Sequence, residues 1–189
     1  VEEEQREQTK KRNKLLYQSE HDELTGLYNK RSLNRYLEDV FEACKLNEKE
    51  LGILFLDIDY FKQLNDRYGH GKGDEGICAV ADTLKKIFPE DYVARYGGDE
   101  FLVVMTGRDL TYVMEHAESL CAGIREYKIP NEDSELEPWL TISVGGVCAI
   151  PREPNRVWDF LSAADNTLYE QKKEQKGKVR FYQGEGKYL

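Results

Sequence analysis

The chain of 189 residues is 40% hydrophobic and 11% aromatic, which fits one medium globular domain with a short appendage rather than a disordered chain. Its 36 acidic residues outnumber its 27 lysines and arginines, and the net charge of −9 argues against general nucleic-acid binding, which requires a basic face. No apolar run is long enough to cross a membrane and no signal peptide opens the chain, so we expect no membrane contact. The four cysteines are widely spaced and form no Cys-x-x-Cys pattern, which is typical of reduced thiols, and we therefore expect a cytoplasmic protein.

Residues 1–20 are rich in helix formers and contain charged pairs at helical spacing, such as Glu2 with Arg6. Their apolar content is too low for an independent fold, and they show no sustained heptad repeat. We therefore predict a helical linker over residues 1–20, leading from an upstream domain into a globular domain over residues 21–189. The alternative is a solvated helix that frays.

The first half of the globular part alternates helix and strand patterns. Apolar residues at helical spacing follow Lys30 and predict an amphipathic helix. The stretch LGILFLDID, residues 51–59, is nearly continuous in apolar residues before its acids, which predicts a central strand buried on both faces. The glycine-interrupted residues 60–74 predict a short helix, and apolar spacing after them predicts a longer one ending near Phe88.

A hairpin with acids in its turn is predicted by VARYGGDEFLVVM, residues 93–105. Gly97 and Gly98 separate two apolar runs, and we expect them to supply the positive φ angles of a tight turn. The adjacent carboxylates Asp99 and Glu100 repel each other unless water, a cation or a basic partner offsets their charge.

The remaining patterns predict a helix over residues 110–127, an apolar strand over 139–150, a last helix from Val157, and a closing strand at 178–182. The complete order predicts an α/β fold: a mixed β-sheet flanked by helices, with a short N-terminal helix in front of it.

Four acids are expected to gather at one end of this sheet. Asp57 and Asp59 lie at the exit of the central strand, and short connections make the hairpin with Asp99 and Glu100 its plausible neighbour. Clustered carboxylates are the oxygen ligands that Mg²⁺ or Mn²⁺ prefers, usually completed by substrate phosphates. In the alternative reading, Asp59 caps the following helix and the other acids are solvated turn residues.

Five motifs in order resemble the GGDEF family of diguanylate cyclases. RYGGDEF (95–101) resembles the family's signature, and DELTGLYNKR (22–31) its opening motif. LDIDYFKQLNDRYGHGKGD (56–74) resembles its metal- and guanine-binding stretch, and TISVGG (141–146) and AADNTLYEQK (163–172) resemble its later blocks. Together they are far more specific than the five-letter signature alone.

This resemblance implies an enzyme that condenses two GTP molecules to cyclic di-GMP and releases two pyrophosphates. It implies a fold similar to the palm of polymerases and class III nucleotide cyclases, and two Mg²⁺ or Mn²⁺ ions per active site. It also implies a homodimer, in which the 3′-hydroxyl of each GTP attacks the α-phosphate of the other, and an upstream sensory domain as a further partner.

Carried over by the resemblance, Asp57, Asp99, Glu100 and the carbonyl of Ile58 match the metal ligands. Asp99 and Glu100 are also the matching catalytic acids, with Glu100 placed close to the reacting hydroxyl. Such acids around two metals can lower the pKa of that hydroxyl and neutralise the leaving pyrophosphate.

Asn65 and Asp74 match the family's guanine contacts. A carboxylate can accept from guanine N1–H and the 2-amino group, a donor pair that adenine lacks. The alternative for Asp74 is a cap of the helix running from Glu75.

The backbone amides of Tyr60 and Phe61 match phosphate contacts at a helix start, where the helix dipole favours anions. Lys62, Lys172 and Lys176 match basic phosphate contacts. Here the family pattern is broken, because Gln175 stands where the family has a glycine before the basic residue.

A second departure concerns the family's Arg-x-x-Asp inhibitory site, which reads FPED here, with Phe88 in place of the arginine and Asp91 retained. We therefore predict weak or absent product inhibition through that site.

Three other functions remain open at this stage. A GGDEF-like module could hold GTP as a regulatory signal without turning it over, although degenerate relatives of that kind usually lack signature acids. A cyclase could also accept ATP and make mixed dinucleotides. A ligand-free dimerisation module would leave the clustered acids unexplained.

Overall fold

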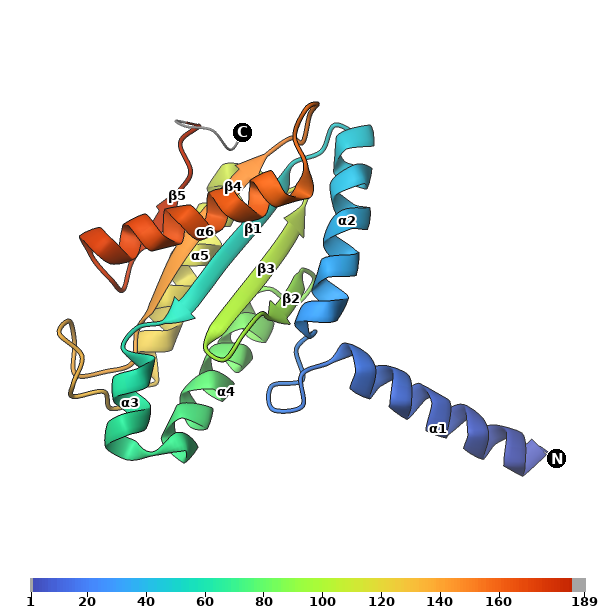
Figure 1. Cartoon of the computed structure of the whole chain (residues 1–189), viewed down its shortest axis with the longest axis horizontal. Helices are drawn as coiled ribbons and strands as arrows, with labels where there is room; N and C mark the ends of the chain where they lie inside the picture. Colours follow the sequence, from blue (N-terminus) through green and yellow to red (C-terminus); the bar gives the residue numbers. More distant parts are fainter. Residues whose placement is uncertain (1, 185–189) are drawn as a thin grey trace.

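The computed structural model describes residues 2–184, in which helices and strands follow the predicted order (Figure 1). The helices are α1 (Glu2–Glu20), α2 (Lys30–Leu46), α3 (Phe61–Tyr68), α4 (His70–Ile87), α5 (Leu110–Glu126) and α6 (Val157–Glu174). The strands are β1 (Leu51–Ile58), β2 (Tyr92–Arg95), β3 (Glu100–Thr106), β4 (Ile142–Ala149) and β5 (Val179–Phe181). Within residues 2–184 no helix combines the length and the apolarity that a membrane crossing requires.

The five strands form one mixed sheet in the order β2-β3-β1-β4-β5. The pairs β2–β3, β3–β1 and β1–β4 are antiparallel. Strand β5 pairs with β4 in parallel at the edge of the sheet. The prediction of a mixed sheet with β1 at its centre is therefore confirmed. The predicted neighbourhood of β1 and the hairpin is confirmed as well, because Asp57 of β1 pairs with Glu100 of β3.

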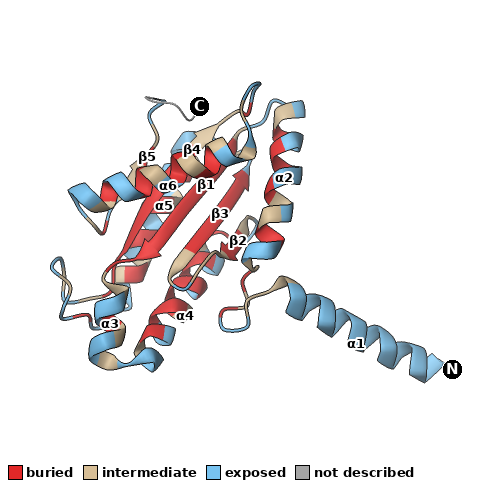
Figure 2. Cartoon of the chain, in the orientation of Figure 1, coloured by how far each residue is buried: buried red, intermediate tan, exposed pale blue. Residues whose placement is uncertain are grey.

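Each face of the sheet carries its own hydrophobic layer, and β1 contributes to both. Its residues Leu54 and Leu56 face the layer built with α4 and α5, whereas Ile53 and Phe55 face the layer built with α2 and α6. This alternation follows from the two-residue period of a strand. Figure 2 shows the outcome, with β1 buried along its length.

Helix α1 lies outside both layers. None of its residues is buried, and it projects away from the sheet (Figures 1 and 2). Contacts begin at its C-terminal end, where Ser32 Oγ and Asn29 Nδ2 donate to the carbonyls of Glu20 and Ser19. The ring of Tyr17 stacks on His21, with 4.0 Å between ring centroids. The last turn of α1 is thus held against the segment that enters the domain.

The β2–β3 hairpin forms as predicted, but its two glycines do not have the expected backbone conformation. Gly97 and Gly98 are not among the residues with positive φ, so that expectation was wrong. A Cβ built on Gly97 would lie 2.6 Å from Oε2 of Glu100. Gly97 thus lies against the flexible end of the Glu100 side chain, and its backbone conformation is one that other residues can adopt.

Gly145 controls how closely α6 approaches the sheet. A Cβ at this position of β4 would lie 2.3 Å from the backbone nitrogen of Leu168 and 2.4 Å from the carbonyl oxygen of Ala164. Both contacts are backbone atoms of α6, which cannot rotate away as a side chain can. The neighbouring Gly146 gives the same room on the opposite face to the ring of Phe181.

We expect Gly145→Ala to lower the free energy of unfolding by about 3 kcal/mol, because α6 must move away from β4. Urea unfolding followed by circular dichroism measures this loss. Gly71→Ala is the matched control, because a Cβ there meets nothing within 4 Å in the first turn of α4. A Gly145→Ala protein as stable as the control would contradict the close packing of α6.

Candidate active site

Three acids meet where β1 ends and β3 begins. Asp57 and Glu100 are direct partners in the register of the two strands. The backbone N–H of Ile58 donates to the carbonyl of Asp99 at 3.2 Å, which fixes the next residue of the turn beside β1. Since directly paired residues share a face, the side chains of Asp57 and Glu100 both lie on the face covered by α2 and α6.

Lys172 of α6 reaches this group of acids. Its Nζ lies 2.5 Å from Oδ2 of Asp57, and the two side chains are only 29% and 12% exposed. The other carboxylate oxygen of Asp57, Oδ1, is buried and has no hydrogen-bond partner. Half of the Asp57 carboxylate is therefore satisfied by the ammonium group, and half has no partner.

Burial dominates the ionisation of these acids. It raises the pKa of Asp57 to about 6, although the hydrogen bond and positive charge of Lys172 oppose this rise. Burial also raises the pKa of Asp99 and of Glu100, and repulsion by Asp99 adds to the rise at Glu100. For Lys172, burial favours the neutral form, but the hydrogen bond to Asp57 and the attraction of nearby acids outweigh it and raise its pKa.

The donor set fits a hard divalent cation that takes its remaining ligands from elsewhere. Carboxylate oxygens of the kind Mg²⁺ and Mn²⁺ prefer converge here, and one of them, Oδ1 of Asp57, lacks any partner. Across residues 2–184, however, no three His, Cys, Asp or Glu side chains are grouped closely enough to hold a metal ion by themselves. The predicted carbonyl of Ile58 lies in the same place, at the last residue of β1.

Asp59 does not cap a helix, so this alternative was wrong. Its side chain is 1% exposed and accepts hydrogen bonds from Thr141 Oγ1 at 2.8 Å and Ser143 Oγ at 2.6 Å. A carboxylate buried to this extent needs such donors. Asp59 therefore ties the end of β1 to the start of β4, and both of its carboxylate oxygens are already hydrogen-bonded.

The chain turns from β1 into α3 at Tyr60, which adopts a left-handed conformation with φ of 53°. Helix α3 then starts at Phe61, so its first backbone N–H groups have no partner within the helix. The Tyr60 ring lies under the Lys176 ammonium group, 4.3 Å from its centroid. Phe61 packs partly against the core, and Lys62 is exposed on α3.

Asn131 supports this turn and was missed at the sequence level. It is fully buried, and its Nδ2 lies 3.5 Å from the carbonyl oxygens of Asp59 and of Tyr60. Nothing in the sequence pattern marks it, because it belongs to the loop between α5 and β4, more than 70 residues away from the turn along the chain.

The predicted guanine contacts lie where α3 meets α4. Oδ1 of Asn65 is buried without a hydrogen-bond partner, and a Cβ at Gly73 would lie 1.9 Å from it. Asp74 is exposed and stands inside α4, which already begins at His70. The reading of Asp74 as an N-cap is therefore wrong, and its carboxylate remains available to a ligand.

The family described as "Diguanylate cyclase, GGDEF domain" matches residues 19–178. The chain belongs to the GGDEF family. Among its curated relatives, the Escherichia coli K12 protein named "Probable diguanylate cyclase DgcC" is 32% identical over 162 residues, which cover 85% of this chain and 42% of that protein. The Pseudomonas aeruginosa protein named "Cyclic di-GMP phosphodiesterase NbdA" is 30% identical over 171 residues, covering 89% of this chain and 21% of that protein. This chain therefore spans less than half the length of these relatives.

The solved structure of the coiled coil and GGDEF domain of DgcB from Caulobacter crescentus, in complex with c-di-GMP, has the same fold. Its TM-score is 0.85 at 23% identity, with 94% of this chain and 93% of that chain covered. The resemblance seen in the sequence motifs, and the fold that it implied, are both confirmed.

Arg95 clamps the turn of this GGDEF domain. Its Nη2 donates to the carbonyl of Gly98 at 2.7 Å, and its Nε lies 3.1 Å from the carbonyls of Gly97 and Gly98. Its Nη1 lies 3.2 Å from both oxygens of Asp22, which in turn accepts from the backbone N–H and the hydroxyl of Thr25. Asp22 and Arg95 each begin one of the family motifs, but no pattern in the sequence predicts that they pair.

Phe88, at the position where the family has the inhibitory-site arginine, is part of the hydrophobic core. Phe88 is 1% exposed and belongs to the layer of α4 and α5, so it presents no polar group to a ligand. Asp91 is partly buried, which raises its pKa. The expectation of weak product inhibition stays a prediction.

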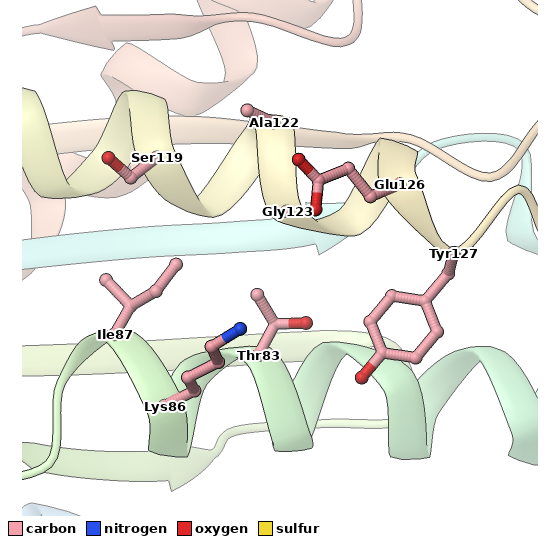
Figure 3. Close-up of a pocket in the computed structure, with 8 residues that line it drawn as sticks. All are labelled: Thr83, Lys86, Ile87, Ser119, Ala122, Gly123, Glu126 and Tyr127. Atoms are coloured by element: carbon pink, nitrogen blue, oxygen red, sulfur yellow. The ribbon is translucent and has the colours of Figure 1, made fainter.

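A groove of about 570 Å³ lies between α4 and α5, and none of the acids lines it. Figure 3 shows Thr83, Lys86 and Ile87 of α4 facing residues of α5 across it. Its lining includes none of the predicted site residues and no convergent set of ligand-binding groups. The acids at the ends of β1 and β3 therefore remain the candidate active site.

We expect Asp22→Asn to lower the free energy of unfolding by about 1–2 kcal/mol at pH 7, because it removes a half-buried partner of Arg95. Burial favours the neutral acid, but the hydrogen bonds from Thr25 and Arg95 outweigh it and hold the pKa of Asp22 below its usual 3.8. The carboxylate therefore stabilises the fold above pH 3.8, and this stabilisation is lost as the pH falls through the lowered pKa.

Urea unfolding of wild type and Asp22→Asn between pH 7 and pH 3 measures this effect, with Glu23→Gln as the control for an exposed neighbouring acid. The difference between wild type and Asp22→Asn should shrink at the acidic end. A difference that stays constant with pH would show that the carboxylate charge contributes nothing.

Proposed function

We propose that this domain is a diguanylate cyclase that condenses two GTP molecules to cyclic di-GMP and two pyrophosphates. In each half of the reaction a 3′-hydroxyl oxygen bonds to the α-phosphorus of the other GTP, the bond to pyrophosphate breaks, and the hydroxyl proton leaves. The observation that carries the proposal is the group of Asp57, Asp99 and Glu100 at adjacent strand ends, in a chain of the GGDEF family.

Asp57, Asp99, Glu100 and the Ile58 carbonyl are the groups that would hold two Mg²⁺ or Mn²⁺ ions. When bound, the cations supply polarisation of the α-phosphate and neutralisation of the leaving pyrophosphate. The raised pKa of Glu100 and its place beside the other acids suit a group that accepts the proton of the 3′-hydroxyl.

The triphosphate is proposed to lie between the start of α3 and the end of α6. The backbone amides at Tyr60 and Phe61 offer unpaired N–H groups, and the helix dipole favours an anion there. Lys172 and Lys176 face this turn from the other side, and Lys62 is exposed on α3. Asn65 lies about one turn further along α3 and Asp74 lies in α4, and the guanine edge is proposed to contact them there.

The product needs two substrates that attack each other, and each chain provides one set of acids. Catalysis therefore requires two copies of this chain facing each other, each holding one GTP. Turnover per subunit should rise with protein concentration until the dimer is saturated.

We expect Glu100→Gln to lower cyclic di-GMP formation by about 10²- to 10⁴-fold without unfolding the protein, because the amide cannot take up the proton. Chromatographic separation of nucleotides after incubation with GTP and Mg²⁺, over a series of protein concentrations, measures the product. Glu115→Gln on the exposed side of α5 is the control. GTP binding without product at any wild-type concentration would point instead to a GTP-holding regulatory module.

Base selection is proposed to depend on Asp74. We expect Asp74→Asn to lower the preference for GTP over ATP by about 10- to 100-fold, because the carboxylate's paired hydrogen bonds to guanine are lost. Competition between the two nucleotides in one reaction measures the preference. Glu75→Gln removes the same charge from the next residue, which pairs with Lys72, and should leave the preference unchanged. An unchanged preference in Asp74→Asn would remove Asp74 from the base site.

A further inference from the structure

Lys172 is the cation that the acids at the ends of β1 and β3 share. Its ammonium lowers the pKa of Asp57, Asp59, Asp99 and Glu100 alike. Other cations act on single members of this set: Lys176 on Asp59, Arg95 on Asp99 and Lys30 on Glu100. Lys172 is also the one in hydrogen-bond contact, through Oδ2 of Asp57. In the nucleotide-free chain, a single side chain thus does part of what a bound cation would do.

Lys172 and a metal ion bound by Asp57 need the same place. The ammonium is bonded to one oxygen of this carboxylate, and a divalent cation beside it would repel a positive charge at such short range. The metal can bind well only if the ammonium moves. Because Lys172 is half-buried, its ammonium group needs another partner once it moves away from Asp57.

We infer that Lys172 is an antagonist of metal binding in the nucleotide-free site, and that a triphosphate removes this antagonism by giving the ammonium a new partner. The inference rests on the proposed roles of the site, namely metal binding by Asp57 and phosphate binding near Lys172. Metal and nucleotide then favour each other's binding through one lysine, and such coupling is reciprocal. The lack of any preformed three-ligand metal group in residues 2–184 agrees with a site that binds metal weakly by itself.

The test measures Mn²⁺ binding to the nucleotide-free protein at pH 7.5 by electron paramagnetic resonance, which detects free Mn²⁺. We expect Lys172→Met to bind Mn²⁺ about tenfold more tightly than wild type. Lys173→Met is the matched control, because Lys173 is the next residue of α6 and stacks on the exposed ring of Tyr169 instead. Its Mn²⁺ affinity should equal that of wild type.

Two further variants make the result specific. The double variant Lys172→Met/Asp57→Asn should lose the gain, because the ion then lacks its carboxylate. Lys172→Gln is neutral but can still donate to Asp57, so it keeps the test usable if the methionine variant does not fold, and it should also gain Mn²⁺ affinity.

Equal Mn²⁺ affinity in wild type and in a folded Lys172→Met or Lys172→Gln protein would overturn the inference. So would a gain of the same size in Lys173→Met, because it would reflect net charge alone. None of these readouts requires cyclic di-GMP formation, so an inactive wild-type chain would contradict the proposed function without affecting this result.

Discussion

The structure depends on keeping two like charges face to face inside a folded sheet. The register of β1 and β3 makes Asp57 and Glu100 direct partners on one face, an arrangement that destabilises a sheet when nothing offsets it. Lys172 provides the offset from α6, and burial provides the rest by raising the pKa of both acids. These two effects hold the acids together at the ends of β1 and β3.

The position of that lysine follows from packing well away from the acids. Gly145 lets the backbone of α6 come against β4 at Ala164 and Leu168. Lys172 lies one helical turn beyond Leu168 on the same face of α6, so the height of its ammonium above the sheet is set by this contact. Gly145 of β4 therefore influences how close the Lys172 ammonium lies to the acids. The close contacts of Gly145 with α6 and of Gly146 with Phe181 explain why two glycines stand in TISVGG.

Apolar periodicity was sufficient to predict the order of the elements in the globular part, because each face of the sheet is covered and the helices α2 to α6 each have a buried side. It failed where a long-range contact decides a local feature. Asp59 was read as a local cap, yet hydroxyl groups of β4, more than 80 residues later, hold it. The Lys172–Asp57 pair joins residues 115 positions apart, and no periodic pattern records such a pair.

The acidic turn is also joined to α1 through a short series of contacts. Arg95 holds the turn carbonyls and Asp22, while the rings of Tyr17, His21, Tyr28 and Tyr92 form a stack from the last turn of α1 to β2. Tyr28 adds backbone hydrogen bonds to Val93 and Arg95 on the same strand. Because α1 itself has no buried residue, its direction is set by these contacts at its end. Tyr28 and Tyr92 of this stack also pack against the layer of α2 and α6, so the same contacts join the end of α1 to β2, to the Arg95-bound turn and to that layer.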